Sequence, residues 1–178
     1  DDSLFSVNVT FTIQVVATND SPVLDSATYI VSEDQLLQNQ LTAVDIEGDS
    51  LTFSVVSTTS NGALELFEDG VFTYNPVDNY FGEDSFTARV GDGFGVSSEV
   101  NFQIQVDAVN DAPVLSTATY TVNEDQLLQG QITAVDIEGD NLMFSVVSTT
   151  SNGALELSED GVFSYSPAVN FSGEYSFT

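Results

Sequence analysis

Alternation of apolar and polar residues with a period of two is the dominant pattern along the chain. It is clearest over residues 97–107, where one face carries Val100, Phe102, Ile104 and Val106 and the other Asn101, Gln103 and Gln105. Such alternation is typical of an antiparallel β-strand with one buried face. No stretch shows a convincing helical period with caps, although residues 33–41 have room for one short turn. The pattern therefore predicts an all-β protein.

Runs of β-branched and aromatic residues alternate with turn signals throughout residues 19–109. We expect strands near 27–32, 41–45, 51–57, 63–67, 71–75, 84–90 and 97–107. Asn61-Gly62 and Asp69-Gly70 are typical of tight hairpins, because these residues tolerate a positive φ. Seven short strands with this spacing predict a seven-stranded antiparallel, immunoglobulin-like β-sandwich.

The chain contains an internal repeat. The Asn-Asp pair at 19–20 recurs at 110–111, an offset of 91 residues (110 minus 19), and residues 19–87 match 110–178 without a gap at 52 of 69 positions. The same offset aligns the apolar residues of 11–15 with those of 102–106. We therefore expect tandem repeats: the last strand of a preceding repeat at 1–18, a complete repeat at 19–109, and a second repeat lacking its final strand or strands at 110–178.

Charge is almost entirely of one sign. The chain has 28 acidic residues, no His, and Arg89 as its single basic residue, for a formal net charge of -27. Nothing is available to neutralise phosphates, which excludes nucleic acid and anionic membranes as partners. Such a polyanion repels itself unless cations collect where carboxylates converge.

Composition argues against an enzyme. The chain has no Cys, which excludes disulfides and thiolate metal sites, and its 42% apolar content is enough for packed cores. Without His, Cys or Lys, general base and nucleophilic roles would fall to carboxylates or to an unassisted hydroxyl. We therefore expect no catalytic residues and no enzymatic activity.

Acidic residues gather at the predicted turns. Asp45, Glu47 and Asp49 lie within five residues directly after a predicted strand, with Gly48 for a sharp bend. Calcium takes six to eight oxygen ligands, and alternate carboxylates on a turn can point at one place. The spacing alone fits a solvated acidic turn equally well. Further acids occur in loops that a sandwich would bring to its two ends.

The order of these motifs resembles a known family. The strand of residues 100–106 followed by Asn110-Asp111-x-Pro113, together with an Asp-x-acid turn, resembles the cadherin repeat. More closely, the run of Asp45-Ile46-Glu47-Gly48-Asp49, then Phe72-x-Tyr74-x-Pro76-x-x-Asn79, is similar to cadherin-like tandem repeats of giant RTX-type biofilm adhesins of bacteria. The resemblance covers essentially the whole chain.

The resemblance implies calcium ions between successive repeats. At the joint inside the chain it implies the ligands Glu33, Glu83, Asp84, Asn110, Asp111, Asp136 and Glu138. At the preceding joint it implies Asn19, Asp20, Asp45, Glu47 and Asp92. The sequence departs from the family where Tyr175 replaces Asp84 in the second repeat and where Asp107 is displaced by one position. The number of ions per joint is therefore left open.

The leading functional expectation is a structural extender repeat of an extracellular or bacterial cell-surface adhesin or fibre, rigidified by calcium between neighbouring repeats of the chain. One alternative is a self-polymerising filament, in which residues 1–18 complete the last domain of another copy by strand addition. The other is a carbohydrate-binding module for polysaccharide, with Tyr29, Tyr80 and Phe81 as the candidate aromatic contacts.

Overall fold

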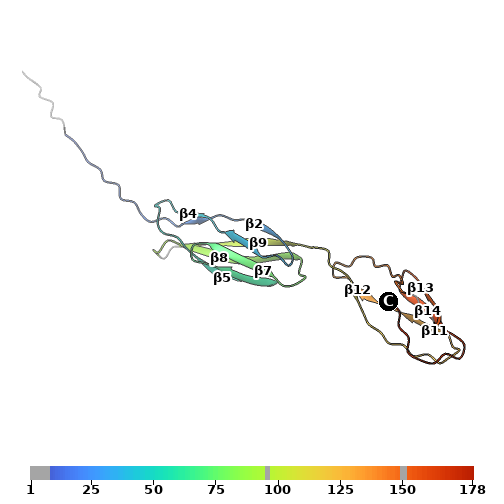
Figure 1. The fold of residues 1–178 in the computed structure, drawn as a ribbon. Coiled ribbons are helices and arrows are strands. Elements are labelled where there is room, and N and C mark those ends of the chain that lie inside the picture. The colour runs from blue at the N-terminus through green and yellow to red at the C-terminus, as the bar shows by residue number, and fades with distance from the viewer. Residues whose placement is uncertain (1–8, 95–96, 149–151) are drawn as a thin grey trace, which may run out of the picture. The chain divides into compact units, whose positions relative to one another are not determined.

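The chain folds into two compact units of β-structure. The computed structural model describes residues 9–94, 97–148 and 152–178, and it divides the chain into Asp1–Asp107 and Ala108–Thr178. Every regular element in these described ranges is a β-strand, which confirms the all-β prediction (Figure 1). The first eight residues of the strand predicted at 1–18 lie outside the described residues.

The first unit contains a β-sandwich of two sheets and a short ribbon. The larger sheet has the order β2 (Thr28–Ser32), β9 (Ser97–Asp107), β8 (Gly82–Gly91) and β5 (Thr52–Ser57). The smaller sheet has the order β3 (Leu37–Gln40), β7 (Val71–Pro76) and β6 (Gly62–Leu66). The ribbon pairs β1 (Val23–Leu24) with β4 (Ala43–Val44). The strands of the larger sheet run side by side in Figure 1.

Strand β9 is the centre of the larger sheet. It pairs antiparallel with β8 over the full length of β8 and parallel with β2. Its inward residues Phe102, Ile104 and Val106 are at most 1% exposed, as the alternating pattern predicts. The parallel β2–β9 pair departs from the antiparallel prediction. A parallel pair needs a long crossover, and the other strands of the unit provide it.

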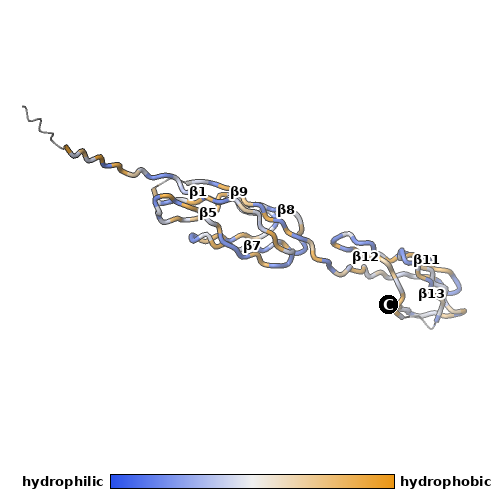
Figure 2. The backbone as a smooth tube through the Cα atoms, turned by 90° about the horizontal axis from the view of Figure 1, so that it is seen from above, coloured by the Kyte–Doolittle hydropathy of each residue, from blue (hydrophilic) through white to orange (hydrophobic). Residues whose placement is uncertain are grey.

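Aromatic rings fill the space between the two sheets. Phe86 of β8 stacks on Phe102 of β9 with ring centroids 5.1 Å apart, and Phe72 of the smaller sheet lies 5.4 Å from Phe86. Tyr29 of β2 meets Phe72 edge-on at 4.9 Å. Figure 2 shows the alternation of apolar and polar positions along these strands. The core of the first unit is therefore built from both sheets at once.

One local prediction was wrong, and one strand was not predicted. Residues 33–41 form a β-turn, with Asp34 at φ 58°, followed by β3 rather than a helical turn. Only Leu37 of β3 is buried, so its sequence carries little strand signal. Gly70 has the predicted positive φ of 86°, but Gly62 does not. Gly62 instead begins β6, where the ring of Tyr74 leaves no room for a Cβ.

The second unit keeps only part of this architecture. Strands β11 (Leu128–Gln131), β14 (Val162–Pro167) and β13 (Gly153–Leu157) reproduce the smaller sheet, and β10 (Val114–Leu115) with β12 (Ala134–Val135) reproduces the ribbon. The counterparts of β2, β5 and β8, at 119–123, 143–148 and 173–178, form no strand. The counterpart of β9 would begin at residue 188 (97 plus 91), beyond Thr178. The larger sheet of the second unit thus has no central strand within the 178 residues.

Residues 9–18 form neither strand nor helix. Phe11, Ile13 and Val15 are 85%, 86% and 89% exposed, and Figure 1 shows this segment leading away from the sheets of the first unit. No helix within the described ranges has the length and apolar character needed to cross a membrane.

Candidate metal centre

Five of the predicted ligands lie together at the end of the first unit where the chain enters it. We call Asn19, Asp20, Asp45, Glu47 and Asp92 its N-terminal pole. The Asn19 side-chain amide donates to Oδ2 of the buried Asp92 at 2.7 Å, and the Asp20 backbone N–H donates to Oε2 of Glu47 at 3.2 Å. These bonds connect three separate segments of the chain.

The acidic turn after β4 is shaped by its own first carboxylate. Asp45 Oδ1 accepts the backbone N–H groups of Glu47 at 3.1 Å and Asp49 at 2.9 Å. Gly48 supplies the positive φ of 79° that the turn needs. The second oxygen, Asp45 Oδ2, is buried and has no hydrogen-bond partner among the described residues. A buried carboxylate oxygen without a donor is suited to a cation.

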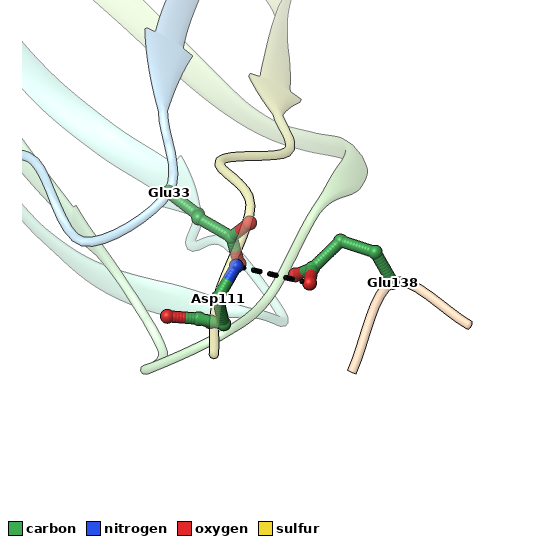
Figure 3. Close-up of side chains that lie close together, drawn as sticks. All are labelled: Glu33, Asp111 and Glu138. Carbon is green, nitrogen blue, oxygen red and sulfur yellow. Dashed lines mark hydrogen bonds between the residues drawn. The ribbon is translucent and has the colours of Figure 1, made fainter. Parts of the chain in front are cut away.

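The second unit repeats two of these contacts at its own N-terminal pole, formed by Asn110, Asp111, Asp136 and Glu138. The Asp111 backbone N–H donates to Oε2 of Glu138 at 3.1 Å, which is the dashed bond of Figure 3. Asp136 Oδ1 accepts the backbone N–H of Asp140 at 2.9 Å, as Asp45 does in the first unit. Asp111 Oδ2 and Glu138 Oε1 are buried and have no hydrogen-bond partner in the described part of the chain.

Two further predicted ligands lie at the opposite, C-terminal pole of the first unit. Ser32 pairs with Asp107 and Gly82 with Val106, so the residues that follow Ser32 and Gly82 lie beside the end of β9. Glu33 is fully buried and its backbone N–H donates to the Asp107 carbonyl at 2.9 Å. Glu83 is exposed, and its carbonyl accepts the Tyr80 hydroxyl at 2.6 Å. Both acids therefore lie where the chain leaves the first unit.

Asp84 occupies a different environment from the acids at the two poles. It is 6% exposed, and its carboxylate accepts four hydrogen bonds, from the backbone N–H groups of Ser60, Asn61 and Ser85 and from the Tyr74 hydroxyl. Burial opposes ionisation of this carboxyl, but the four bonds outweigh burial and hold the pKa of Asp84 below its ordinary value. Its counterpart Tyr175 accepts the backbone N–H of Asn152 at 3.1 Å. This position fixes a turn in each unit, a role that the sequence reasoning missed.

Tyr74 responds to the same carboxylate. Burial raises the pKa of its hydroxyl, and the hydrogen bond to Asp84 and the negative charge of Asp84 raise it further. The hydroxyl therefore remains a proton donor to Asp84 across the physiological range. Because the sequence shows only an acid beside a predicted strand, it does not distinguish this structural carboxylate from a metal ligand.

The donor set fits a hard cation, but neither unit has a full set by itself. Calcium takes six to eight oxygens, and carboxylate and carbonyl oxygens are its usual ligands. Within the described residues of either unit taken alone, no three acidic side chains have oxygens all within 4.8 Å of one another. Each pole by itself therefore offers a partial ligand set.

The three aromatic residues considered for polysaccharide binding differ in burial and in their contacts. Tyr29 packs on Phe72 in the core, and Tyr80 is half-buried with its hydroxyl bonded to a backbone carbonyl. Phe81 is 43% exposed. The described contacts therefore use two of the three rings for packing and hydrogen bonding within the first unit.

Both units match families of bacterial domains. Residues 19–108 match the bacterial cadherin-like domain, and residues 110–178 match the bacterial Ig domain. Domains of these kinds are typically extracellular or surface-exposed and structural or adhesive rather than enzymatic. The two units are near-copies of each other, so the two descriptions apply to one type of repeat. No curated protein sequence matches the chain.

Solved structures show the same fold at low identity. Human protocadherin-24 EC1-2 is 18% identical, with a TM-score of 0.53, covering 90% of this chain and 92% of that one. The protocadherin gammaB4 extracellular domain is 17% identical, with a TM-score of 0.52, covering 84% and 29%.

An endo-fucoidan hydrolase of glycoside hydrolase family 107 is 21% identical over 84% of this chain, with a TM-score of 0.42. This chain spans 24% of the length of that enzyme. On the match over residues 19–108 and the cadherin-like fold, the chain belongs to the bacterial cadherin-like domain family.

Proposed function

We propose that this chain is a structural extender segment of an extracellular adhesin or fibre, and that calcium stiffens the joints between its repeats. The observation that carries the proposal is the N-terminal pole, where the same backbone-to-glutamate bond recurs in both units and carboxylate oxygens are buried without hydrogen-bond donors among the described residues. An affiliation with giant bacterial biofilm adhesins is part of the same proposal.

The proposed ion at the inner joint would take ligands from both units. We assign Glu33 from the first unit and Asp111 and Glu138 from the second, three of the ligands that the resemblance to the cadherin repeat implies. Asp136, Glu83 and the carbonyl of Asn110 would complete the set. Chain connectivity supports this assignment. The Glu33 backbone N–H donates to the Asp107 carbonyl, and the four Cα-to-Cα steps from Asp107 to Asp111 span at most about 14 Å when extended.

The proposed mechanism is electrostatic. A chain with a net charge of -27 and one basic residue has no internal counter-ion for acids brought together at a joint. Without a cation these acids repel one another, so the joint stays open and variable. A divalent ion neutralises two charges and bonds oxygens of both units. The joint then has one preferred geometry. Extracellular sites of this kind bind calcium at roughly 0.1 to 1 mM.

Calcium titration by isothermal calorimetry tests the proposal. We expect the wild-type chain to bind calcium, and Glu138→Gln to lower the affinity of the inner joint at least about tenfold, because ligand charge sets affinity. Glu65→Gln removes the same charge from an exposed position on β6 and serves as the matched control. Equal binding by all three proteins, or no binding to the wild type, would contradict the proposal.

A second candidate function rests on the exposed segment at residues 9–15. Its apolar residues Phe11, Ile13 and Val15 align with Phe102, Ile104 and Val106 of β9, yet they are at least 85% exposed. We propose that this segment serves as the last strand of a neighbouring repeat, including one in another copy of the chain. Sedimentation of the 178-residue chain should then show association that deletion of residues 1–18 abolishes. Association that survives the deletion would rule the idea out.

A further inference from the structure

The C-terminal pole of the first unit also contains a hydrogen bond made by an acid outside the predicted ligand set. Asp34 Oδ1 accepts the backbone N–H of Asn79 at 3.2 Å, across 45 positions of sequence. We propose that Asp34 is a positioning residue for calcium at the inner joint, which holds Glu33 and Glu83 in place without binding the ion. This inference rests on the proposed function and extends it to a residue that the resemblance to the cadherin repeat does not imply.

The Asp34–Asn79 bond joins two β-turns. Asp34 is the third residue of the turn at 32–35, in which the N–H of the fourth residue donates to the carbonyl of the first at 3.3 Å. Asn79 is the third residue of the turn at 77–80, where the equivalent bond is 3.0 Å. Both residues have φ 58°, a left-handed conformation that Asp and Asn tolerate better than other non-glycine residues do. The bond therefore connects equivalent positions of two tight turns.

A continuous set of contacts runs from one predicted ligand to the other through this bond. Glu33 directly precedes Asp34 in the first turn. Tyr80 directly follows Asn79 in the second turn, and its hydroxyl donates to the Glu83 carbonyl at 2.6 Å. Loss of the Asp34–Asn79 bond would leave the two turns free to move apart, and the two predicted ligands would move with them.

The second unit repeats the bond between its own turns. Asp125 Oδ1 accepts the backbone N–H of Asn170 at 3.2 Å, and the two residues have φ 62° and 59°. The larger sheet is not present within the described residues of this unit, so the bond does not depend on that sheet. Asp125 thus provides a copy of the contact at the C-terminal pole of the second unit, which supplies no predicted ligand to the inner joint.

A positioning role has a physical basis in the cost of ordering ligands. A group that is already held in place loses less conformational entropy when the ion binds. Hydrogen bonds outside the ligand set orient metal ligands in this way, and their removal lowers metal affinity. Asp34 is exposed, whereas Glu33 beside it is fully buried. The two neighbouring acids therefore have different environments, which fits one ligand and one residue that fixes the turn.

Two substitutions separate positioning from charge. Asp34→Gly removes the acceptor oxygen, and glycine adopts φ 58° without strain. Asp34→Asn removes the same charge but keeps an acceptor oxygen and tolerates the positive φ. By isothermal calorimetry of the 178-residue chain, Asp34→Gly should lower the calcium affinity of the inner joint about 2- to 10-fold, the range that one net hydrogen bond provides. Asp34→Asn should bind calcium as the wild type does.

Asp125→Gly is the matched control, because it makes the same change at the equivalent position of the second unit. The affinity of the inner joint should not respond to it. Tyr80→Phe should also lower this affinity, since it removes the hydroxyl that reaches the Glu83 carbonyl. Adding Tyr80→Phe to Asp34→Gly should then cost little more, because both changes break the same set of contacts.

Amide hydrogen exchange in calcium-free protein gives a second readout that does not involve the ion. The Asn79 N–H should lose protection in Asp34→Gly and keep it in Asp34→Asn, because only the second variant retains an acceptor. Exchange in the strands of the larger sheet reports whether either variant has loosened the fold as a whole.

Failure of this inference and failure of the proposed function give different results. A wild type that binds no calcium would overturn the proposed function and the positioning role together. Calcium binding that is equal in the wild type and in Asp34→Gly would overturn the positioning role alone. Equal weakening by Asp34→Gly and Asp34→Asn would also overturn it, because the charge of Asp34 would then act on the ion directly. So would an equal loss in Asp125→Gly.

Discussion

The two units carry nearly the same sequence but not the same structure, and the difference identifies the strand on which the sandwich depends. The smaller sheet and the ribbon form in both units. Among the described residues the larger sheet forms only in the first, where β9 joins β2 to β8. Leu24 of the first unit is 5% exposed, whereas its counterpart Leu115 is 58% exposed. In the described part of the second unit the pairs of the smaller sheet and of the ribbon form without a counterpart of β9, but the pairs of the larger sheet do not.

The poles show the opposite behaviour. The Asp-Glu turn and the bond from the Asp20 or Asp111 N–H to a glutamate recur in both units, although the larger sheet is present in only one of them within the described residues. These contacts are made by a short turn and a linker, which do not need β9. The candidate ligand arrangement is therefore a local property of the repeat, while the core is a property of the complete repeat.

The largest expected effect comes from supplying the missing strand. We expect that appending a copy of residues 88–109 after Thr178 gives the second unit its larger sheet, because three large apolar side chains would each contribute about 1.5 to 3 kcal/mol on burial. Amide hydrogen exchange should then show protection at 119–123, 143–148 and 173–178. The control carries Ser in place of the three inward apolar residues. Protection that is equal with and without those residues would refute the role given to this strand.

A smaller effect is expected from Phe102→Ala in the first unit. Phe102 is fully buried and stacks on Phe86, so its loss should cost about 3 to 5 kcal/mol of unfolding free energy. Phe11→Ala changes the same position of the repeat pattern, but Phe11 is 85% exposed, and it should leave the stability of the first unit unchanged. Urea unfolding measures both variants. Similar losses for the two would mean that residues 9–15 contribute to the core.

The smallest expected effect comes from replacing Asp84. Asp84→Asn should lower the stability of the first unit at neutral pH by about 1 to 3 kcal/mol, because a carboxylate with four donors is replaced by an amide that cannot accept from all of them. The folded pKa lies below the ordinary 3.8, so ionised Asp84 stabilises the fold above that value. This contribution is lost as pH falls through the folded pKa.

The difference in stability between wild type and Asp84→Asn is the measurement, since it cancels the titration of the other acids. We expect the difference to shrink as pH falls below 3.8. A difference independent of pH between neutral and strongly acidic solution would show that the charge of Asp84 is not what stabilises the turn.

The sequence predicts those strands whose side chains alternate between a buried and an exposed face. Residues 97–107 are the clearest case, and β9 has those bounds. The sequence does not predict β3, because this strand buries only Leu37. Nor does it predict the parallel direction of the β2–β9 pair, because alternation carries no information about strand direction. The acids of the N-terminal poles are visible as motifs. Their hydrogen bonds to one another are not, since these depend on how separate loops meet.

Asp84 shows where reading the sequence reaches its limit. An acid next to a strand looks the same whether it binds a cation, faces water or holds a turn. The structure places Asp84 in the interior with four donors, so its carboxylate has a structural partner set already. The assignment of calcium to the acids at the poles is a prediction, and a binding measurement tests it.

Small-angle X-ray scattering of the 178-residue chain, in millimolar calcium and then in excess chelator, tests the central claim most directly. We predict a longer maximum dimension and a narrower distance distribution with calcium than with chelator. The double variant Asp111→Asn, Glu138→Gln should lose this response. A maximum dimension that is the same with calcium and with chelator in the wild type would contradict calcium stiffening of the joint.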